Sequence, residues 1–183
     1  AFSSQILAKE AIRAKSEEVI MENKLQWQKI LLDALNTSDK SSQQVINDVI
    51  AQVGEVLNAD VAALYVKDKQ GDLDCQYIWS KNQSMSAEEY VTEWQRANMK
   101  FRSWQNGQGS GKLVDKGYLV IDAKHMDEAA KKIMSGGPVK SFTAVPVYVN
   151  GNYGAVFVLA NTSINKLWTT EEIEFVKQTG DVL

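Results

Sequence analysis

Cysteine and histidine are nearly missing from this chain of 183 residues, which contains one of each, Cys75 and His125. A single cysteine cannot form an internal disulfide, so the chain is not a disulfide-stapled secreted scaffold. The two residues together cannot supply the four ligands of a structural zinc site. A Cys-His catalytic pair would require that Cys75 and His125 meet, and Ser-His-Asp chemistry would have to use His125 alone. We therefore expect no enzyme activity, no catalytic residue and no metal site.

Arginine is also scarce, and the charges nearly cancel. Twenty basic residues, only three of them arginines, stand against 23 acidic ones, for a net charge of −3. A nucleic-acid-binding protein is expected to carry clustered positive charge. No such cluster occurs here, so we expect no nucleic-acid partner.

Long apolar runs are absent as well. The longest clearly apolar runs are the six residues 61–66 and the six residues 155–160, whereas a membrane-spanning helix needs about 20. The N-terminus lacks the continuous apolar core of a signal peptide. We expect a cytoplasmic protein, and we expect that these 183 residues make no direct contact with a membrane. Because the chain lacks an initiator Met and ends within a helical pattern at Leu183, we interpret it as a piece of a longer protein.

Residues 1–36 contain no glycine or proline and are rich in good helix formers, which predicts one long helix. Within it, Ile20, Asn23, Trp27, Ile30 and Ala34 follow the 3-4-3-4 spacing of a coiled-coil seam. In the first half of the helix the same register is occupied by Lys9, Arg13 and Ser16. We expect this helix to pack on a domain at its C-terminal end and on a partner helix elsewhere. The alternative is a frayed linker helix.

We divide the chain into an N-terminal dimerisation and signalling helix, residues 1–38, and a domain, residues 39–183. The domain begins with a helix that Ser41 and Gln44 cap and that ends near Asn58. Further helices are predicted over 86–99 and 125–134, and a last one begins after Thr169 with Glu172 completing its capping box.

The domain's strands are predicted over 61–66, 73–79, 118–122, 139–149 and 153–160. Turns at 68–71 and at Asn150-Gly151 join two pairs of them into hairpins. Hairpins indicate an antiparallel sheet, so the fold class is α+β. In the second strand Leu73, Cys75, Tyr77 and Trp79 alternate with polar residues, which predicts that they share one face.

The sequence motifs that could indicate a binding or catalytic activity are weak. The Gly-rich segment 107–112 has Asn106 and Leu113 where a phosphate-binding loop needs glycine and a hydroxyl residue. We interpret it as a loop at the mouth of the sheet. His125 is interpreted as a residue at a helix start, with an axial haem ligand or a general base as the alternatives. Cys75 is interpreted as a buried thiol, with covalent attachment or redox sensing as its alternative.

Aromatic residues are the better lead, because they gather around the predicted sheet and its loops. Phe101 and Trp104 lie in a loop, where packing does not require them. Aromatic walls with a few polar groups are typical of a small-molecule pocket. A plain core explains most of these residues equally well.

Four stretches in a fixed order resemble a GAF domain, the small-molecule-binding sensory module of signalling proteins. They are residues 45–65, 109–123, 139–161 and the start of the last helix at Trp168. The most specific is the third, where Ser141, Val145-Pro146-Val147, Gly151, Gly154 and Asn161 match the family's hairpin. A PAS domain is the alternative fold, but that family lacks the first long helix.

The resemblance implies a central antiparallel sheet of about six strands, with long helices on one face and a ligand pocket under short helices and loops on the other. It also implies a homodimer through the N- and C-terminal helices. The ligand-binding residues we expect are Tyr77, Trp79, Phe101, Trp104, Tyr118, Asp122, Ser141 and Thr143.

Departures from the family's motifs narrow the choice of ligand. The Asn-Lys…Phe…Asp-Glu signature of members that bind cyclic nucleotides reads Asn161-Thr162, Trp168 and Glu172-Ile173 here. Bilin-binding members have Cys next to His, whereas Gln76 follows Cys75. Members that reduce methionine sulfoxide need several cysteines, so that activity is excluded.

We therefore expect a domain that senses a small molecule of unknown identity and passes the change through dimer helices to an output domain. The cofactor is unknown. The alternative function is a structural dimerisation module that binds no ligand.

Overall fold

The structure is a computed structural model that describes residues 2–36, 39–71, 73–81, 117–122, 140–162 and 166–183. Its elements are α1 (Phe2–Leu35), α2 (Ser42–Val56), β1 (Val61–Lys67), β2 (Leu73–Ser80), β3 (Leu119–Ile121), β4 (Ser141–Val149), β5 (Asn152–Asn161) and α6 (Thr170–Val182). The five strands of this part form one antiparallel sheet in the order β2-β1-β5-β4-β3. The expected α+β fold with an N-terminal helix is confirmed, and about six strands was an approximation. The helices expected over 86–99 and 125–134 lie outside the described residues.

The capping boxes predicted for the first and the last helix of the domain are confirmed, whereas the one predicted at Ser86 and Glu89 lies outside the described residues. The Ser41 hydroxyl accepts the Gln44 N–H, and the Gln44 side chain accepts the Ser41 N–H at the start of α2. Thr169 and Glu172 make the same reciprocal pair at the start of α6. Each box satisfies N–H groups that have no partner within the helix. The sequence therefore predicts where α2 and α6 begin.

The β4–β5 hairpin turns at Asn150-Gly151, as predicted. Both residues have positive φ, 52° and 77°, which matches a two-residue turn whose twist suits paired strands. Gly154 lies at a shift of register near this turn, between the pairs Val147–Ala155 and Tyr148–Tyr153. This long hairpin supplies two neighbouring inner strands of the sheet, β5 beside β1 and β4 beside β3.

A bulge in β2 overturns the expected face of that strand. Tyr65 pairs with Cys75 while its neighbour Leu64 pairs with Tyr77, so Gln76 is an extra residue. One extra residue reverses the alternation of side chains beyond it. Cys75 therefore packs on one side of the sheet, and Tyr77 and Trp79 on the other. The prediction that these residues share one face is wrong.

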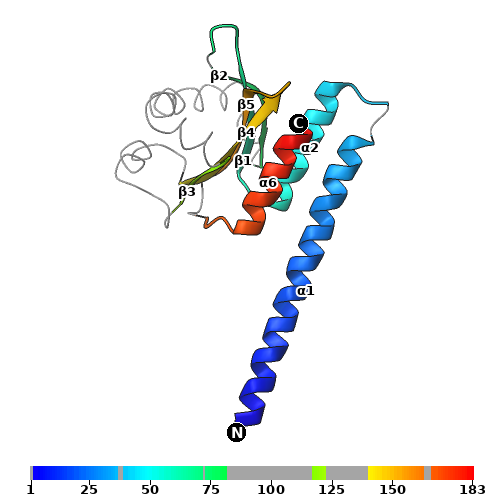
Figure 1. The fold of residues 1–183 in the computed structure, drawn as a ribbon, viewed down its shortest axis with the longest axis vertical. Coiled ribbons are helices and arrows are strands. Elements are labelled where there is room, and N and C mark those ends of the chain that lie inside the picture. Colours follow the sequence, from blue (N-terminus) through cyan, green and yellow to red (C-terminus); the bar gives the residue numbers. More distant parts are fainter. Residues whose placement is uncertain (1, 37–38, 72, 82–116, 123–139, 163–165) are drawn as a thin grey trace.

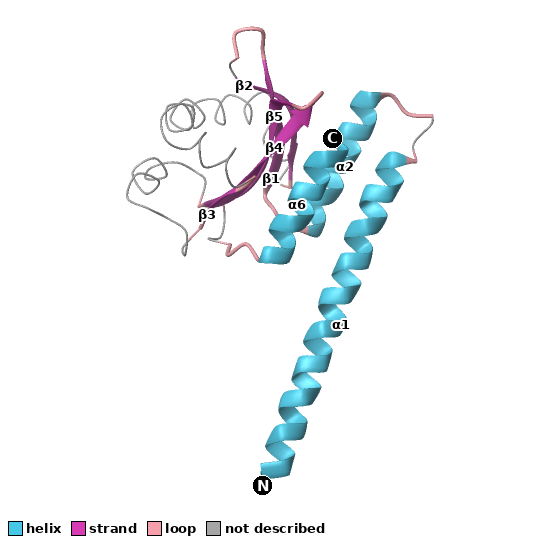
Figure 2. Cartoon of the chain, viewed as in Figure 1, coloured by secondary structure: helices cyan, strands magenta, loops and turns pink. Residues whose placement is uncertain are grey.

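The three described helices all lie on one side of the sheet (Figures 1 and 2). The core between them and the sheet includes Phe157, Leu159, Ile50, Val53 and Val176, all essentially buried. A second apolar cluster covers the other face of the sheet. We call these two sides the helix face and the second face.

Glycine allows close contact between layers at two places on the helix face. A Cβ on Gly54 of α2 would lie 2.4 Å from the Trp79 ring, and one on Gly180 of α6 would lie 3.3 Å from Val145. The helices approach the sheet so closely only because these positions have no side chain. The packing of α2 on β2 and of α6 on β4 therefore depends on them.

Helix α1 docks on the domain through its C-terminal end, as predicted. The Trp27 ring stacks on Phe175 of α6 with 5.0 Å between centroids and 14° between planes. Ile30, Leu31 and Ala34 pack against the same core. The remainder of α1 extends away from the domain (Figure 1). The C-terminal half of the predicted seam is thus an intramolecular contact.

Candidate functional site

Six of the eight expected ligand-binding residues lie in the described part of the chain. The aromatic members Tyr77, Trp79 and Tyr118 pack against the core of the helix face. This is the face that the helices occupy, opposite to the one where the resemblance implies a pocket. That these three aromatic residues contact a ligand stays a prediction, and their position on the helix face does not support it. Phe101 and Trp104 lie outside the described residues, as do His125 and the Gly-rich segment 107–112.

The three polar residues of the expected set, Asp122, Ser141 and Thr143, are completely buried and form hydrogen bonds between segments that are distant in the sequence. Asp122 accepts the N–H of Trp168 at 3.2 Å, and the Ser141 hydroxyl accepts the N–H of Lys166 at 3.1 Å. The Thr143 hydroxyl donates to the Leu119 carbonyl at 3.2 Å. Asp122 and Ser141 thereby fix the segment that leads into α6, and Thr143 links β4 to β3. These bonds give all three residues a structural role.

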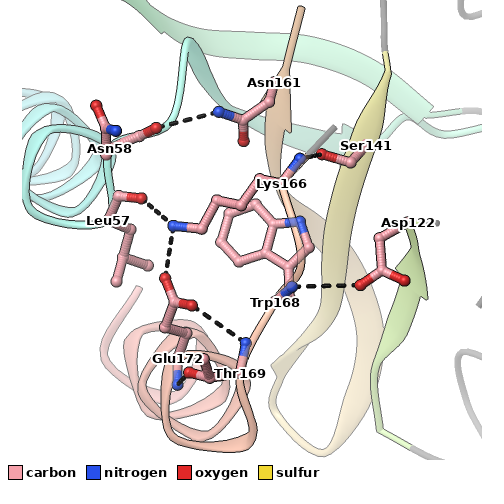
Figure 3. Close-up of polar contacts among 9 residues, drawn as sticks. All are labelled: Leu57, Asn58, Asp122, Ser141, Asn161, Lys166, Trp168, Thr169 and Glu172. Atoms are coloured by element: carbon pink, nitrogen blue, oxygen red, sulfur yellow. Dashed lines mark hydrogen bonds and ion pairs between the residues drawn. The ribbon is translucent and has the colours of Figure 1, made fainter. Parts of the chain in front are cut away.

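Lys166 is the centre of a polar cluster that joins the end of α2 to the start of α6 (Figure 3). Its ammonium forms an ion pair with Glu172 at 2.6 Å, donates to the Leu57 carbonyl and lies 4.5 Å from the Trp168 ring centroid. Only about 15% of either charged side chain is exposed. Because the pair is largely desolvated, loss of one partner leaves a buried charge.

Asn161 and Asp60 extend these links from β5 to the α2–β1 connection. The Asn161 amide donates to the carbonyl of Asn58, a residue with a positive φ of 53°. Asp60 accepts the N–H of Thr162 at 2.8 Å. The conspicuous polar residues near the strand ends therefore tie α2, the sheet and α6 into one unit.

Sequence reasoning missed Lys166, because it looked for the lysine directly after Asn161, where Thr162 stands. Lys166 lies five positions beyond Asn161 and forms an ion pair with Glu172. The only available signal was its position two residues before Trp168 and six before an acidic residue.

The second face is lined by apolar side chains with few polar atoms. Its buried members include Ala63, Tyr65, Phe142, Ala144 and Val158. Cys75 packs at its edge on β2, and its thiol donates to the Tyr77 carbonyl at 3.6 Å. Burial raises the pKa of the Cys75 thiol to about 11, although the hydrogen bond with the Tyr65 side chain opposes this rise. The face combines apolar walls with a phenol and a protonated thiol.

Cys75 should react slowly with thiol reagents in the folded protein. A pKa near 11 in place of 9.0 lowers the thiolate fraction at pH 8 by roughly 100-fold, and the thiolate is the reactive form. The measurement is the rate of reaction with Ellman's reagent in native buffer and in guanidinium. Equal rates under both conditions would contradict the partly buried, protonated thiol.

The model of the GAF domain family matches residues 41–183 of this chain. The chain belongs to the GAF domain family. The match begins at the residue that caps α2 and includes every described element except α1. The motif residues have clear physical tasks: Ser141 and Asn161 make buried hydrogen bonds, and Gly151 adopts the turn's positive φ.

Solved GAF domains share this fold at low identity. The GAF domain of a phosphoenolpyruvate-protein phosphotransferase from Coxiella burnetii has a TM-score of 0.60 and 14% identity, with 88% of this chain and 90% of that one covered. The phycocyanobilin-bound GAF domain of a cyanobacterial phytochrome has 0.62 and 12%, with 87% and 90% covered. The GAF domain of a putative sensor histidine kinase from Pseudomonas syringae pv. tomato has 0.55 and 12%, with 88% and 86% covered.

No curated protein sequence matches the chain. In the described segments no helix has the length and apolar character to cross a membrane. Nor do these segments contain a group of three or more potential metal ligands.

Proposed function

We propose that this GAF domain is a small-molecule-sensing regulatory domain of a signal-transduction protein. The family assignment supports the proposal, together with a fold shared with GAF domains from a phytochrome and a sensor kinase. The neighbour bound to phycocyanobilin shows that this fold accepts an organic ligand in that protein. The observation that carries the proposal is the division of one sheet into two apolar faces, of which α1, α2 and α6 occupy only one.

The ligand in this proposal binds on the second face. The helix face is filled by α2 and α6, and a Cβ on Gly54 already has no room there. On the second face, small side chains at Ala63 and Ala144 lie among larger ones, and the hydroxyl of Tyr65 supplies a polar group. An apolar wall with a few polar groups suits a planar or largely apolar ligand. The raised pKa of Cys75 argues against covalent attachment through that thiol.

The signal in this proposal passes through β4 and α6 to α1. Phe142 and Ala144 of β4 lie on the second face, whereas Val145 and Val147 of the same strand meet Gly180 of α6. Five residues earlier in α6, Phe175 stacks on Trp27 of α1. A ligand that shifts β4 would thereby bias how α1 docks. The proposal includes no catalytic step.

The same proposal places the domain in the cytoplasm as a homodimer through its N- and C-terminal helices. Its output domain would lie elsewhere in the full protein. The ligand-free dimerisation module is the alternative, favoured by the complete burial of Ala144 and Ala160 on the second face.

A thermal-shift screen tests the sensing function. The panel holds cyclic nucleotides, amino acids, organic acids, haem and biliverdin at millimolar concentration. A ligand at 100 times its Kd stabilises the folded state by about 2.7 kcal/mol, and each kcal/mol raises the Tm by roughly 2–4 °C at this size. We expect at least one compound to raise the Tm by about 5–10 °C. No shift across the panel, together with a native mass that the protein chains alone account for, would support the ligand-free alternative.

A further inference from the structure

Helix α1 carries a second apolar stripe, which the domain leaves uncovered. We call it the outer stripe. It consists of Leu7, Ala11, Ala14, Glu18, Met21, Leu25, Gln28, Leu32 and Leu35. These positions follow a strict 4-3 spacing along the whole helix, and all except Glu18 and Gln28 are apolar. Its leucines and its methionine are 57–67% exposed.

The outer stripe lies on the opposite side of α1 from the docking contact. At about 100° per residue, Leu25 is roughly 160° around the helix from Trp27. Trp27 faces Phe175 of the domain, so the outer stripe faces away from it. The docking face itself offers no continuous seam further along, because Lys9, Arg13 and Ser16 interrupt it.

The N-terminal part of α1 needs a partner to be stable. Residues 3–26 are exposed throughout, and none of them belongs to either of the two apolar clusters of the described residues. Isolated helices are marginal in water, and packing of an amphipathic face supplies most helical stability. A heptad stripe of this length is the surface that a second helix covers.

We propose that the outer stripe is the homodimer interface, and that two copies of α1 pair on it in antiparallel orientation. The charges beside the stripe fit a second copy in this orientation. When Leu7 is opposite Leu32 of the second copy, Glu17 meets Lys24 and Lys15 meets Glu22, each pair occurring twice by symmetry. Opposite charges at these flanking positions select partner and orientation. This inference deepens the homodimer of the proposed function and does not depend on the ligand.

Parallel pairing brings like charges together. It puts Glu17 beside Glu22 and Lys24 beside Lys29, with only Glu10 and Lys15 attractive. It also stacks Glu18 on Glu18 in the core of the interface, whereas antiparallel pairing places Glu18 opposite Met21. If the antiparallel register is shifted by one heptad in one direction, Lys24 meets Lys24 of the second copy. If it is shifted in the other direction, Glu17 meets Glu17. Only the full-length antiparallel register avoids every such contact.

Disulfide trapping tests the orientation on the full 183-residue chain with Cys75→Ala as background. A mixture of Leu7→Cys and Leu32→Cys proteins should give a cross-linked heterodimer under mild oxidation, and each variant alone should not cross-link. Cross-linked homodimers in the single-variant samples would indicate parallel pairing and overturn the proposal.

Sedimentation velocity tests whether the outer stripe is the face of α1 that forms the dimer. Leu25→Glu removes one leucine from each of two symmetric layers, so we expect the dimer dissociation constant to rise at least about 100-fold. Ile12→Glu is the matched control: Ile12 is 68% exposed on the same helix but outside the outer stripe, so the dimer should persist. Equal effects of both substitutions, or a monomeric parent chain, would overturn the proposal. A monomeric parent that still binds a ligand in the thermal screen would leave the sensing function intact.

A charge exchange separates the two orientations once more. Glu17→Lys should weaken the antiparallel dimer, and adding Lys24→Glu should restore it. In a parallel dimer Glu17→Lys would remove a repulsion from Glu22 and strengthen association. Strengthening by Glu17→Lys therefore contradicts the proposal.

Discussion

Replacing Lys166 by methionine should lower the free energy of unfolding by about 3 kcal/mol. Methionine keeps the length of the apolar stem but removes the ammonium that pairs with Glu172, donates to the Leu57 carbonyl and lies over Trp168. Breaking a buried ion pair from one side costs roughly 3–5 kcal/mol, and the small remaining exposure of this pair places it near the lower end. Urea denaturation followed by circular dichroism measures the change.

The double variant Lys166→Met/Glu172→Gln is the control for that experiment. It leaves no unpaired charge, so it should recover part of the lost stability, and the double-mutant cycle should show a coupling energy of about 1 kcal/mol or more. A second control is Lys177→Met, which removes a half-exposed lysine of α6 that lies 3.7 Å from Glu174. This substitution should change the free energy of unfolding by less than about 1 kcal/mol. A loss as small as that for Lys166→Met would show that the cluster does not hold α6 to α2.

Gly54→Ala should destabilise the domain by about 1–3 kcal/mol, against the ordinary trend for helices. In an exposed helix this substitution gains roughly 1 kcal/mol. Here the new Cβ would lie 2.4 Å from Cε3 and Cζ3 of Trp79 and 3.3 Å from Ala62. Overpacking of this kind costs about 1–3 kcal/mol, because the ring or the helix must move.

Two further variants make the Gly54 prediction specific. Gly180→Ala faces a milder contact of 3.3 Å to Val145, so its effect should be smaller. Adding Trp79→Leu to Gly54→Ala removes the clashing ring, and the two changes together should cost less than the sum of their separate effects. If Gly54→Ala proves as stable as the parent protein, α2 does not pack on β2 as described.

Local signals predicted much of the fold correctly. Ser41 and Thr169 were identified as helix caps because each stands three residues before a side chain that completes a capping box. Asn150-Gly151 identified the long hairpin because both residues tolerate a positive φ. These features depend on neighbours in the sequence, so the sequence alone suffices.

The site was predicted less well, because its features depend on contacts between distant residues. The bulge at Gln76 has no local signal, yet it moves Tyr77 and Trp79 to the helix face. Lys166 meets Glu172 only after the chain folds around α2. Helix α1 carries two apolar stripes, and only the position of Phe175 shows that Trp27 belongs to the intramolecular one.

The central claim is that the two faces of one sheet have separate tasks, packing of helices on one and ligand binding on the other. Methyl NMR spectra of alanine-labelled protein, titrated with a compound from the thermal screen, test it most directly. Ala62 and Ala63 are neighbours on β1, but they lie on the helix face and the second face. We predict the largest shifts at Ala63, Ala144 and Ala160, with small ones at Ala59, Ala62 and Ala155. Larger shifts in the second group would contradict the account.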